Sequence, residues 1–190
     1  VGQQIEVAQQ EAVVNLLRIH LRDTYANGKP VPRQGNRSVN AAPSNLYRCR
    51  PFGPNDYVFI HCASVEMWKT LTTIVGRPEL GDDPRYADRR DRVQFIDEVD
   101  AMIEAWTEKR TKHEVLEILA GAGVPCGAVL DSGEVLADPH LRQRGMIVEL
   151  EHPTRGAYPM PANPVRLSDS PTEVVRAPLP MHGKISAIRH

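Results

Sequence analysis

The residues best suited to chemistry are two cysteines and a histidine, Cys49, His61 and Cys62. A histidine beside a thiol can activate a nucleophile, and the same side chains can ligate a metal ion. Adjacent residues of a β-strand point to opposite faces, so His61 and Cys62 cannot face one site unless the strand carries a bulge. The pattern therefore favours buried cysteines that act as small hydrophobic side chains, with a nucleophile or ligand role as the alternative.

The other candidates for chemistry have ordinary structural explanations. His20, His113 and His140 are scattered and form no H-x-x-x-H or H-E-x-x-H pair that would indicate zinc. The glycines of the segment 121–124 follow a predicted helix and precede a predicted strand, the reverse of the order that binds phosphate. The charged run at 82–92 mixes both signs, which predicts a solvated, salt-bridged face. These residues alone show no self-sufficient active site.

The elements that position these residues are helices mixed with short strands. Ser64 is a typical helix N-cap, Thr111 and Glu114 form a capping box, and Gly28 is a typical helix stop. Hydrophobic periodicity then predicts, in chain order, a strand over 3–7, a helix over 8–26, strands over 46–50 and 57–62, a helix over 65–75, a loop over 80–84, helices over 89–109 and 111–121, a strand over 124–130, helical segments over 132–137 and 139–144, and a strand over 146–150.

Two stretches show little or no periodic pattern. Residues 29–45 and 153–190 are rich in proline, and the chain holds 16 prolines among 190 residues, well above the ~5% that is usual. A long loop of this kind is either a linker or an ordered functional loop. The pattern predicts an α+β body over roughly 46–150 that lies between two extended arms.

Composition excludes several classes of function. The net charge of -1 leaves no basic field for nucleic acid, and 41% hydrophobic residues indicate a globular chain. We find no apolar run of the ~20 residues that would cross a membrane and no secretory signal, so we expect a cytoplasmic protein. Three cysteines without a C-x-x-C pair fit a reducing compartment. The first residues have no initiator Met, which we interpret as the interior of a longer protein.

An ordered series of short motifs resembles the class III CoA-transferase family (CaiB/BaiF type), which includes formyl-CoA transferases. Each motif is weak alone, while their order and spacing along nearly the whole chain are specific. The motifs are GQQIEVAQQEA at 2–12, RQGN at 33–36, GRPEL at 76–80, DPRY at 83–86, RV at 92–93, AGVPCG at 122–127, EVLADPHL at 134–141, RG at 144–145, PVRLS at 164–168 and AP at 177–178.

The resemblance implies a division of the chain. Members of this family have a Rossmann-like large domain, a smaller α+β domain and two long connections, and two subunits interlock. By this resemblance residues 1–27 close the large domain with a strand and a helix, 28–45 form a linker or active-site loop, 46–150 form the small domain, and 151–190 form a return linker and tail. The fold class implied is α+β, with extended connections that pack on the Rossmann-like domain.

The resemblance also implies the chemistry. In the transferases an aspartate attacks an acyl-CoA, and CoA passes to a carboxylic acid through an aspartyl intermediate. That aspartate is expected upstream of this chain, so no catalytic residue, bound cofactor or metal is assigned here, and coenzyme A enters as substrate. The segment that matches the family's active-site loop is Ser38, Val39, Asn40 and Ala41, although it carries none of the family's glycines. An ordered interdomain linker is the alternative.

The sequence also allows two other functions. An alpha-methylacyl-CoA racemase-type member would again carry its acid and base upstream. A non-catalytic remnant or binding subunit would act only on another protein. For the transferase we expect as partner an N-terminal large-domain half, on a separate chain or missing, in an interlocked homodimer-type assembly, without nucleic acid or membrane.

Overall fold

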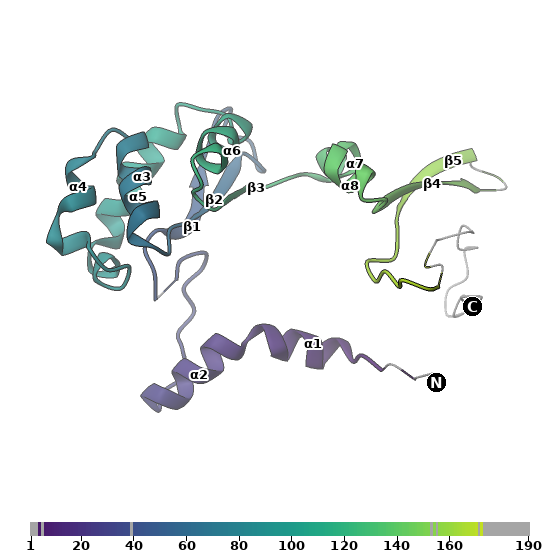
Figure 1. Ribbon diagram of the computed structural model, residues 1–190, viewed down its shortest axis with the longest axis horizontal. Helices are drawn as coiled ribbons and strands as arrows, with labels where there is room; N and C mark the ends of the chain where they lie inside the picture. The colour runs from purple at the N-terminus through teal and green to yellow at the C-terminus, as the bar shows by residue number, and fades with distance from the viewer. Residues whose placement is uncertain are drawn as a thin grey trace. The chain divides into compact units, whose positions relative to one another are not determined.

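The computed structural model describes residues 4, 6–38, 40–152, 154, 156–170 and 172, and Figure 1 labels its elements. The described chain falls into two compact units. The first unit takes its residues from 1–46, 60–103 and 122–125, and the second from 47–59, 104–121 and 126–190. Helices and small sheets are mixed, as the α+β prediction requires.

The first helical stretch consists of two helices, α1 (Gln9–Leu16) and α2 (Arg18–Asn27). The prediction of one continuous helix over 8–26 is wrong because Leu17 leaves the helical conformation, with φ -82° and ψ 3°. Gly28 ends α2 in the left-handed region, as predicted. The predicted strand over 3–7 lies partly outside the described residues, and Gln4, Glu6 and Val7 form no strand.

A three-stranded sheet joins β1 (Ser44–Arg48), β2 (Tyr57–His61) and β3 (Cys126–Ala128) in that order. The predicted strands over 46–50, 57–62 and 124–130 are confirmed with shifted ends. The turn between β1 and β2 is closed by Asp56, whose carboxylate accepts the Gly53 N–H at 2.6 Å. The Cys49 N–H also donates to the Asp56 carbonyl at 2.8 Å.

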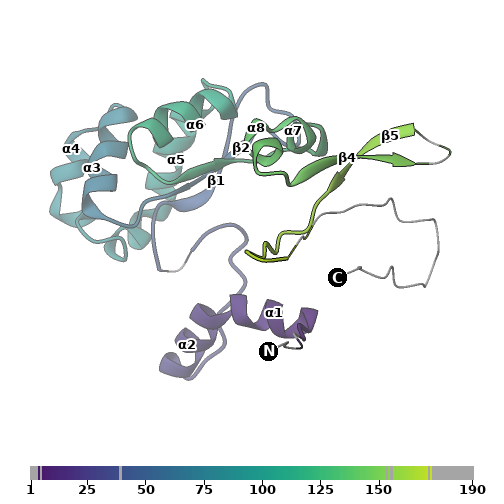
Figure 2. The same cartoon turned by 45° about the vertical axis from the view of Figure 1, so that its right-hand side comes forward.

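Helix α3 (Val65–Ile74) builds the core of the first unit. Its cap is the one predicted, since the Ser64 hydroxyl accepts the Met67 N–H at 3.2 Å. Figure 2 shows α3 beside the short helix α4 (Glu79–Asp82), and the indole N–H of the buried Trp68 donates to the Leu80 carbonyl at 2.9 Å. The predicted loop over 80–84 is therefore wrong in part, because this bond and the burial of the Leu80 side chain stabilise a helical turn there.

The predicted helix over 89–109 is shorter than expected. A 3₁₀ segment, η2 (Asp91–Phe95), precedes α5 (Ile96–Thr107). Another 3₁₀ turn, η1 (Pro84–Tyr86), lies before it. The turn η1 lies in the charged run that the sequence predicts to be a solvated face, and η2 begins in it.

That prediction is wrong for Arg92, which is 1% exposed. Its guanidinium donates to four main-chain carbonyls, those of Ala42 at 2.6 Å, Tyr86 at 2.7 Å, Cys62 at 3.3 Å and Ala87 at 3.5 Å. It also lies 4.7 Å from the centre of the Trp68 ring. Burial lowers the pKa of Arg92, and the carbonyls compensate for the water that the charge has lost.

The second unit has its own buried cation. Helix α6 (Lys112–Gly121) begins at the predicted capping box, in which the Thr111 N–H donates to Glu114 at 2.7 Å. Lys112 is 5% exposed, and its ammonium donates to the Val129 carbonyl at 2.8 Å and to Glu134 at 2.6 Å. Glu134 lies in α7 (Ser132–Ala137), which is the predicted helix.

The chain continues through α8 (Pro139–Gln143) into a hairpin of β4 (Ile147–His152) and β5 (Gly156–Pro161). Strand β4 confirms the strand predicted over 146–150. The weakly periodic pattern after residue 153 predicts no strand, yet β5 pairs antiparallel with β4 over six residue pairs. The sequence does not predict β5 because Pro159 and Pro161 lie in it, and proline is usually absent from strand interiors.

We expect Arg92→Met to lower the free energy of unfolding by about 3 kcal/mol, since three buried carbonyls lose a charged donor. Urea unfolding of the purified chain measures this. Arg90 is the matched control because it is exposed in the same charged run, and Arg90→Met should change stability by less than about 0.5 kcal/mol. Equal effects of the two substitutions would contradict the structural role of Arg92.

Glu134 should contribute stability that depends on pH. Its hydrogen bond from Lys112, followed by those from the Asp131 N–H and His113, lowers its pKa from 4.5 to about 2. Since the folded pKa lies below the unfolded one, this stability is present above pH 4.5 and is lost as the pH falls toward 2. Glu134→Gln should therefore flatten the acid limb of the unfolding free energy measured against pH, whereas Glu117→Gln, on the exposed face of α6, should leave the limb unchanged.

Candidate functional site

The predicted loop residues lie just before β1, in the first unit. Ser38 and Asn40 are half-buried, and Ala41 is buried, whereas Val39 lies outside the described residues. The Ser38 hydroxyl accepts the Asn40 N–H at 3.2 Å, which makes a small local turn. The structure therefore places three of the four predicted residues in one short, ordered segment.

The end of this segment is anchored to the buried core. The Ala42 N–H donates to the Arg89 carbonyl at 3.2 Å, and the Ala42 carbonyl accepts from Arg92 at 2.6 Å. Ala42 itself is fully buried. The segment thus leaves the core at a fixed point, directly after the residues that the sequence assigns to the site.

An ion-pair cluster fixes the start of the segment. The Arg37 guanidinium lies 2.8 Å from the Asp100 carboxylate and 2.9 Å from that of Asp97, both on α5. Burial opposes the charge of Arg37, but the two carboxylates outweigh it and raise its pKa. Asn45, at the start of β1, also donates to Asp100 at 3.0 Å. Both ends of the loop are therefore tied to α5 or to the segment just before it.

A third tie joins the loop to α2. The Asn40 amide donates to the Asp23 carboxylate at 2.7 Å, and Arg22 donates to the other oxygen of Asp23 at 2.8 Å. The hydrogen bonds from Arg22 and then Asn40 lower the pKa of Asp23. Because both oxygens carry donors, Asp23 is suited to hold the loop and poorly suited to attack a substrate.

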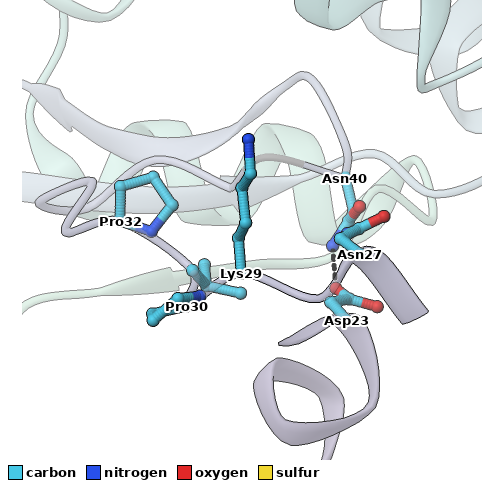
Figure 3. A pocket seen from close by; sticks show the side chains of 7 residues that line it. Asp23, Asn27, Lys29, Pro30, Pro32 and Asn40 are labelled. Atoms are coloured by element: carbon cyan, nitrogen blue, oxygen red, sulfur yellow. Dashed lines mark hydrogen bonds between the residues drawn. The ribbon is translucent and has the colours of Figure 1, made fainter. Parts of the chain in front are cut away.

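Asp23 and Asn40 border an open pocket of about 420 Å³ (Figure 3). The Asp23–Asn40 bond closes one side, and the Lys29 side chain extends away from that pair. The full lining is Asp23, Asn27, Lys29, Pro30, Val31, Pro32 and Asn40. A cation, an amide and proline rings can bind a small polar molecule, and this lining contains no pair of nucleophile and base.

The cysteines confirm the structural interpretation. Cys49 and Cys62 are fully buried, and burial raises the pKa of their thiols to about 11 and about 12. Such thiols are almost entirely protonated at neutral pH and are poor nucleophiles. His61 is half-buried, and burial followed by the charge of Arg89 lowers its pKa.

In the part of the chain that the structure describes, no group of three or more His, Cys, Asp or Glu side chains could hold a metal ion. Within the same residues, none of the helices has the length and apolar character needed to span a bilayer.

Several residues around the loop were not predicted from the sequence. Arg37, Asp100 and Asp23 act over long separations in the chain, and no local pattern marks them. The sequence gives a weak indication that Arg92 is important, because Arg92 belongs to one of the short motifs on which the family resemblance depends. Its burial is visible only in the folded structure.

Comparison with known proteins identifies the family. Residues 1–185 match CoA-transferase family III. The chain is 40% identical over 191 residues to the formyl-CoA:oxalate CoA-transferase of Streptomyces coelicolor, a match that covers 94% of this chain and 46% of that protein. It is 36% identical over 197 residues to the protein of the same name from Bradyrhizobium diazoefficiens, with the same two shares.

Solved structures agree with this match. A CAIB/BAIF family protein from Brucella suis is 28% identical, with a TM-score of 0.69 over 94% of this chain and 45% of that one. Rv3272 from Mycobacterium tuberculosis, at 21% identity, shares the fold, with a TM-score of 0.65 over 90% of this chain and 43% of that one. The chain spans about half the length of the relatives it matches. Since the family match runs through nearly every residue, the chain belongs to CoA-transferase family III.

Proposed function

We propose that the chain supplies the small domain and both connecting segments of a CoA-transferase. The observation that carries this proposal is the 40% identity over 191 residues to a formyl-CoA:oxalate CoA-transferase. The relatives are about twice as long, so the remaining machinery lies in the part of their length that this chain does not match. The division into residues 1–27, 28–45, 46–150 and 151–190 belongs to the same proposal.

The proposed reaction proceeds through an aspartate outside this chain. Its carboxylate oxygen attacks the thioester carbon of an acyl-CoA, the carbon–sulfur bond breaks, and CoA leaves as a thiolate. The thiolate then attacks the aspartyl carbon of the resulting anhydride and releases the first acid, which leaves an aspartyl-CoA thioester. An incoming carboxylate attacks this thioester, its carbon–sulfur bond breaks, and departure of the CoA thiolate leaves a second anhydride. The thiolate then attacks the new acyl carbon of that anhydride and releases the aspartate carboxylate.

In this scheme residues 38–41 cover the intermediate. Backbone N–H groups that are held in place can stabilise the negative charge that develops on a carbonyl oxygen. The ties of Arg37 to Asp100, Asn40 to Asp23, and Arg92 to Ala42 support such a role, because they hold the segment through side chains and the Ala42 carbonyl. Residues 38–41 include no glycine, so we propose that this segment has restricted motion.

The first two helices support the need for a large-domain partner. Neither α1 nor α2, all of whose residues are described, contains a buried residue. Their exposed apolar side chains include Leu16 at 80% and Tyr25 at 92% exposure. Surfaces of this kind usually mark an interface. We propose that an N-terminal large-domain half with Rossmann-like architecture covers them, in an interlocked dimer in the cytoplasm.

Complementation in trans tests the proposal. We would mix the chain with the portion of the Streptomyces coelicolor relative that it does not match, and follow CoA transfer from formyl-CoA to oxalate by chromatography. We expect no transfer by either piece alone and measurable transfer by the mixture. The mixture with the Arg92→Met chain should lose most of this activity, because the loop anchor at Ala42 is lost.

Two results would contradict the transferase proposal. Epimerisation of a 2-methylacyl-CoA by the mixture, without transfer, would assign the racemase chemistry instead. A stable complex that catalyses neither reaction would indicate that the chain is a non-catalytic binding subunit. Native mass spectrometry of the mixture shows whether a complex formed, and so separates failure of assembly from failure of chemistry.

The tie between Asn40 and Asp23 gives a second test. Asn40→Ala removes the 2.7 Å bond to α2, so we expect hydrogen exchange of the amides at 36–41 to become several times faster, with global stability nearly unchanged. Asn36→Ala, an exposed change in the same loop, is the control. Unchanged exchange in Asn40→Ala would show that the bond does not hold the loop.

A further inference from the structure

The hairpin of β4 and β5 has two edges that differ in their chemistry. Among the described residues this pair is a sheet of its own, with two strands and therefore two outer edges. An outer edge presents unpaired N–H and C=O groups, which can accept a further strand. Which groups point outward follows from the pairing register.

The register determines the direction of every backbone group. The Ala162 N–H donates to the Met146 carbonyl at 2.8 Å, so these two residues form a hydrogen-bonded pair. Bonded and non-bonded pairs alternate along an antiparallel ladder. The pairs Val148–Met160 and Leu150–Tyr158 are then bonded, whereas Ile147–Pro161, Glu149–Pro159 and Glu151–Ala157 direct their N–H and C=O groups outward.

Proline closes the outer edge of β5. Pro159 and Pro161 occupy two of the three outward positions and have no N–H to donate. Ala157 alone keeps an outward donor among these three positions. Their placement agrees with the register derived from Ala162, because a proline at a bonded position would break the ladder. The edge of β5 is therefore a poor template for another strand.

The outer edge of β4 keeps all of its donors and acceptors. Ile147, Glu149 and Glu151 point their N–H and C=O groups away from β5, and both glutamates are exposed. Their cross-strand partners are Pro159 and Ala157, which carry no charge. Arg142 approaches Glu149 at 3.5 Å, and both side chains are about half exposed. An added strand would thus meet a row of carboxylates on one face of β4.

We propose that the outer edge of β4 binds an extended strand from another polypeptide segment whose alternate side chains are Lys or Arg. Main-chain hydrogen bonds to Ile147, Glu149 and Glu151 would hold the strand, and its basic side chains would face the two glutamates. A second copy of β4 does not fit, because pairing with itself sets glutamates against glutamates. The proposal is independent of the transferase chemistry.

Binding of a synthetic peptide tests the proposal. The probe is acetyl-KVKVKV-amide, titrated into the ¹⁵N-labelled chain and followed by NMR. We expect saturable shifts that are largest for the amides of Ile147, Glu149 and Glu151, and a loss of affinity of about tenfold or more for EVEVEV and for the lysine peptide N-methylated at every residue.

Proline variants distinguish the two edges. Glu149→Pro removes one outward donor of β4, as Pro159 does on β5, without removing a bond of the hairpin. It should weaken binding more than Glu149→Gln, which removes only the charge, and Ala157→Pro on the far edge should leave binding unchanged. NOE cross-peaks between the strands, at the bonded pairs Val148–Met160 and Leu150–Tyr158, show whether the hairpin is still formed in each variant.

Four results would overturn the proposal that the β4 edge binds a basic strand. Equal binding of the N-methylated peptide would show that main-chain hydrogen bonds do not hold the probe. Equal binding of the glutamate peptide would show that the carboxylates of Glu149 and Glu151 do not select basic side chains. Equal weakening by Ala157→Pro and Glu149→Pro, or a dissociation constant for the lysine peptide above about 1 mM, would also reject the β4 edge as its site.

Discussion

The buried guanidinium of Arg92 is the interaction on which the first unit depends. It binds main-chain carbonyls of Ala42, Cys62 and Tyr86, which belong to three separate segments of the chain, and it lies over the Trp68 ring. A buried cation is costly unless its donors are satisfied, so these segments are held where the carbonyls can reach it. The position of the loop at 38–41 follows from that constraint, because Ala42 ends the loop and is one of the acceptors.

Lys112 plays a comparable part in the second unit, with a different balance of charge. Its ammonium binds the Asn55 and Val129 carbonyls and the carboxylate of Glu134, and so joins the β1–β2 turn, the segment after β3 and α7. Arg92 is held by carbonyl oxygens, whereas Lys112 has a carboxylate as partner. Glu134 also completes the capping box of α7 through the Asp131 N–H at 2.8 Å, so one carboxylate serves both a helix end and a buried ion pair.

In the proposed function, these two buried cations position parts that serve chemistry located outside this chain. The loop before β1 is tied at its start by Arg37, in its middle by Asn40 and at its end by Arg92. In the proposed function this restraint takes the place of glycine flexibility, since a loop that moves little loses little entropy when it closes on an intermediate. The hairpin of β4 and β5 has no part in holding the loop at 38–41. Its two edges differ because proline occupies only one of them.

The sequence by itself determined the family, the mixed α+β character and most helix starts and stops. Ser64, the Thr111/Glu114 box and Gly28 act through backbone groups within a few residues, so their effect can be predicted from local sequence. Only the tertiary structure decided the burial of Arg92, the tie of Asn40 to Asp23 and the pairing of β5. Each of these depends on an acceptor or a strand that the fold brings from elsewhere in the chain, and periodicity carries no information about such a partner.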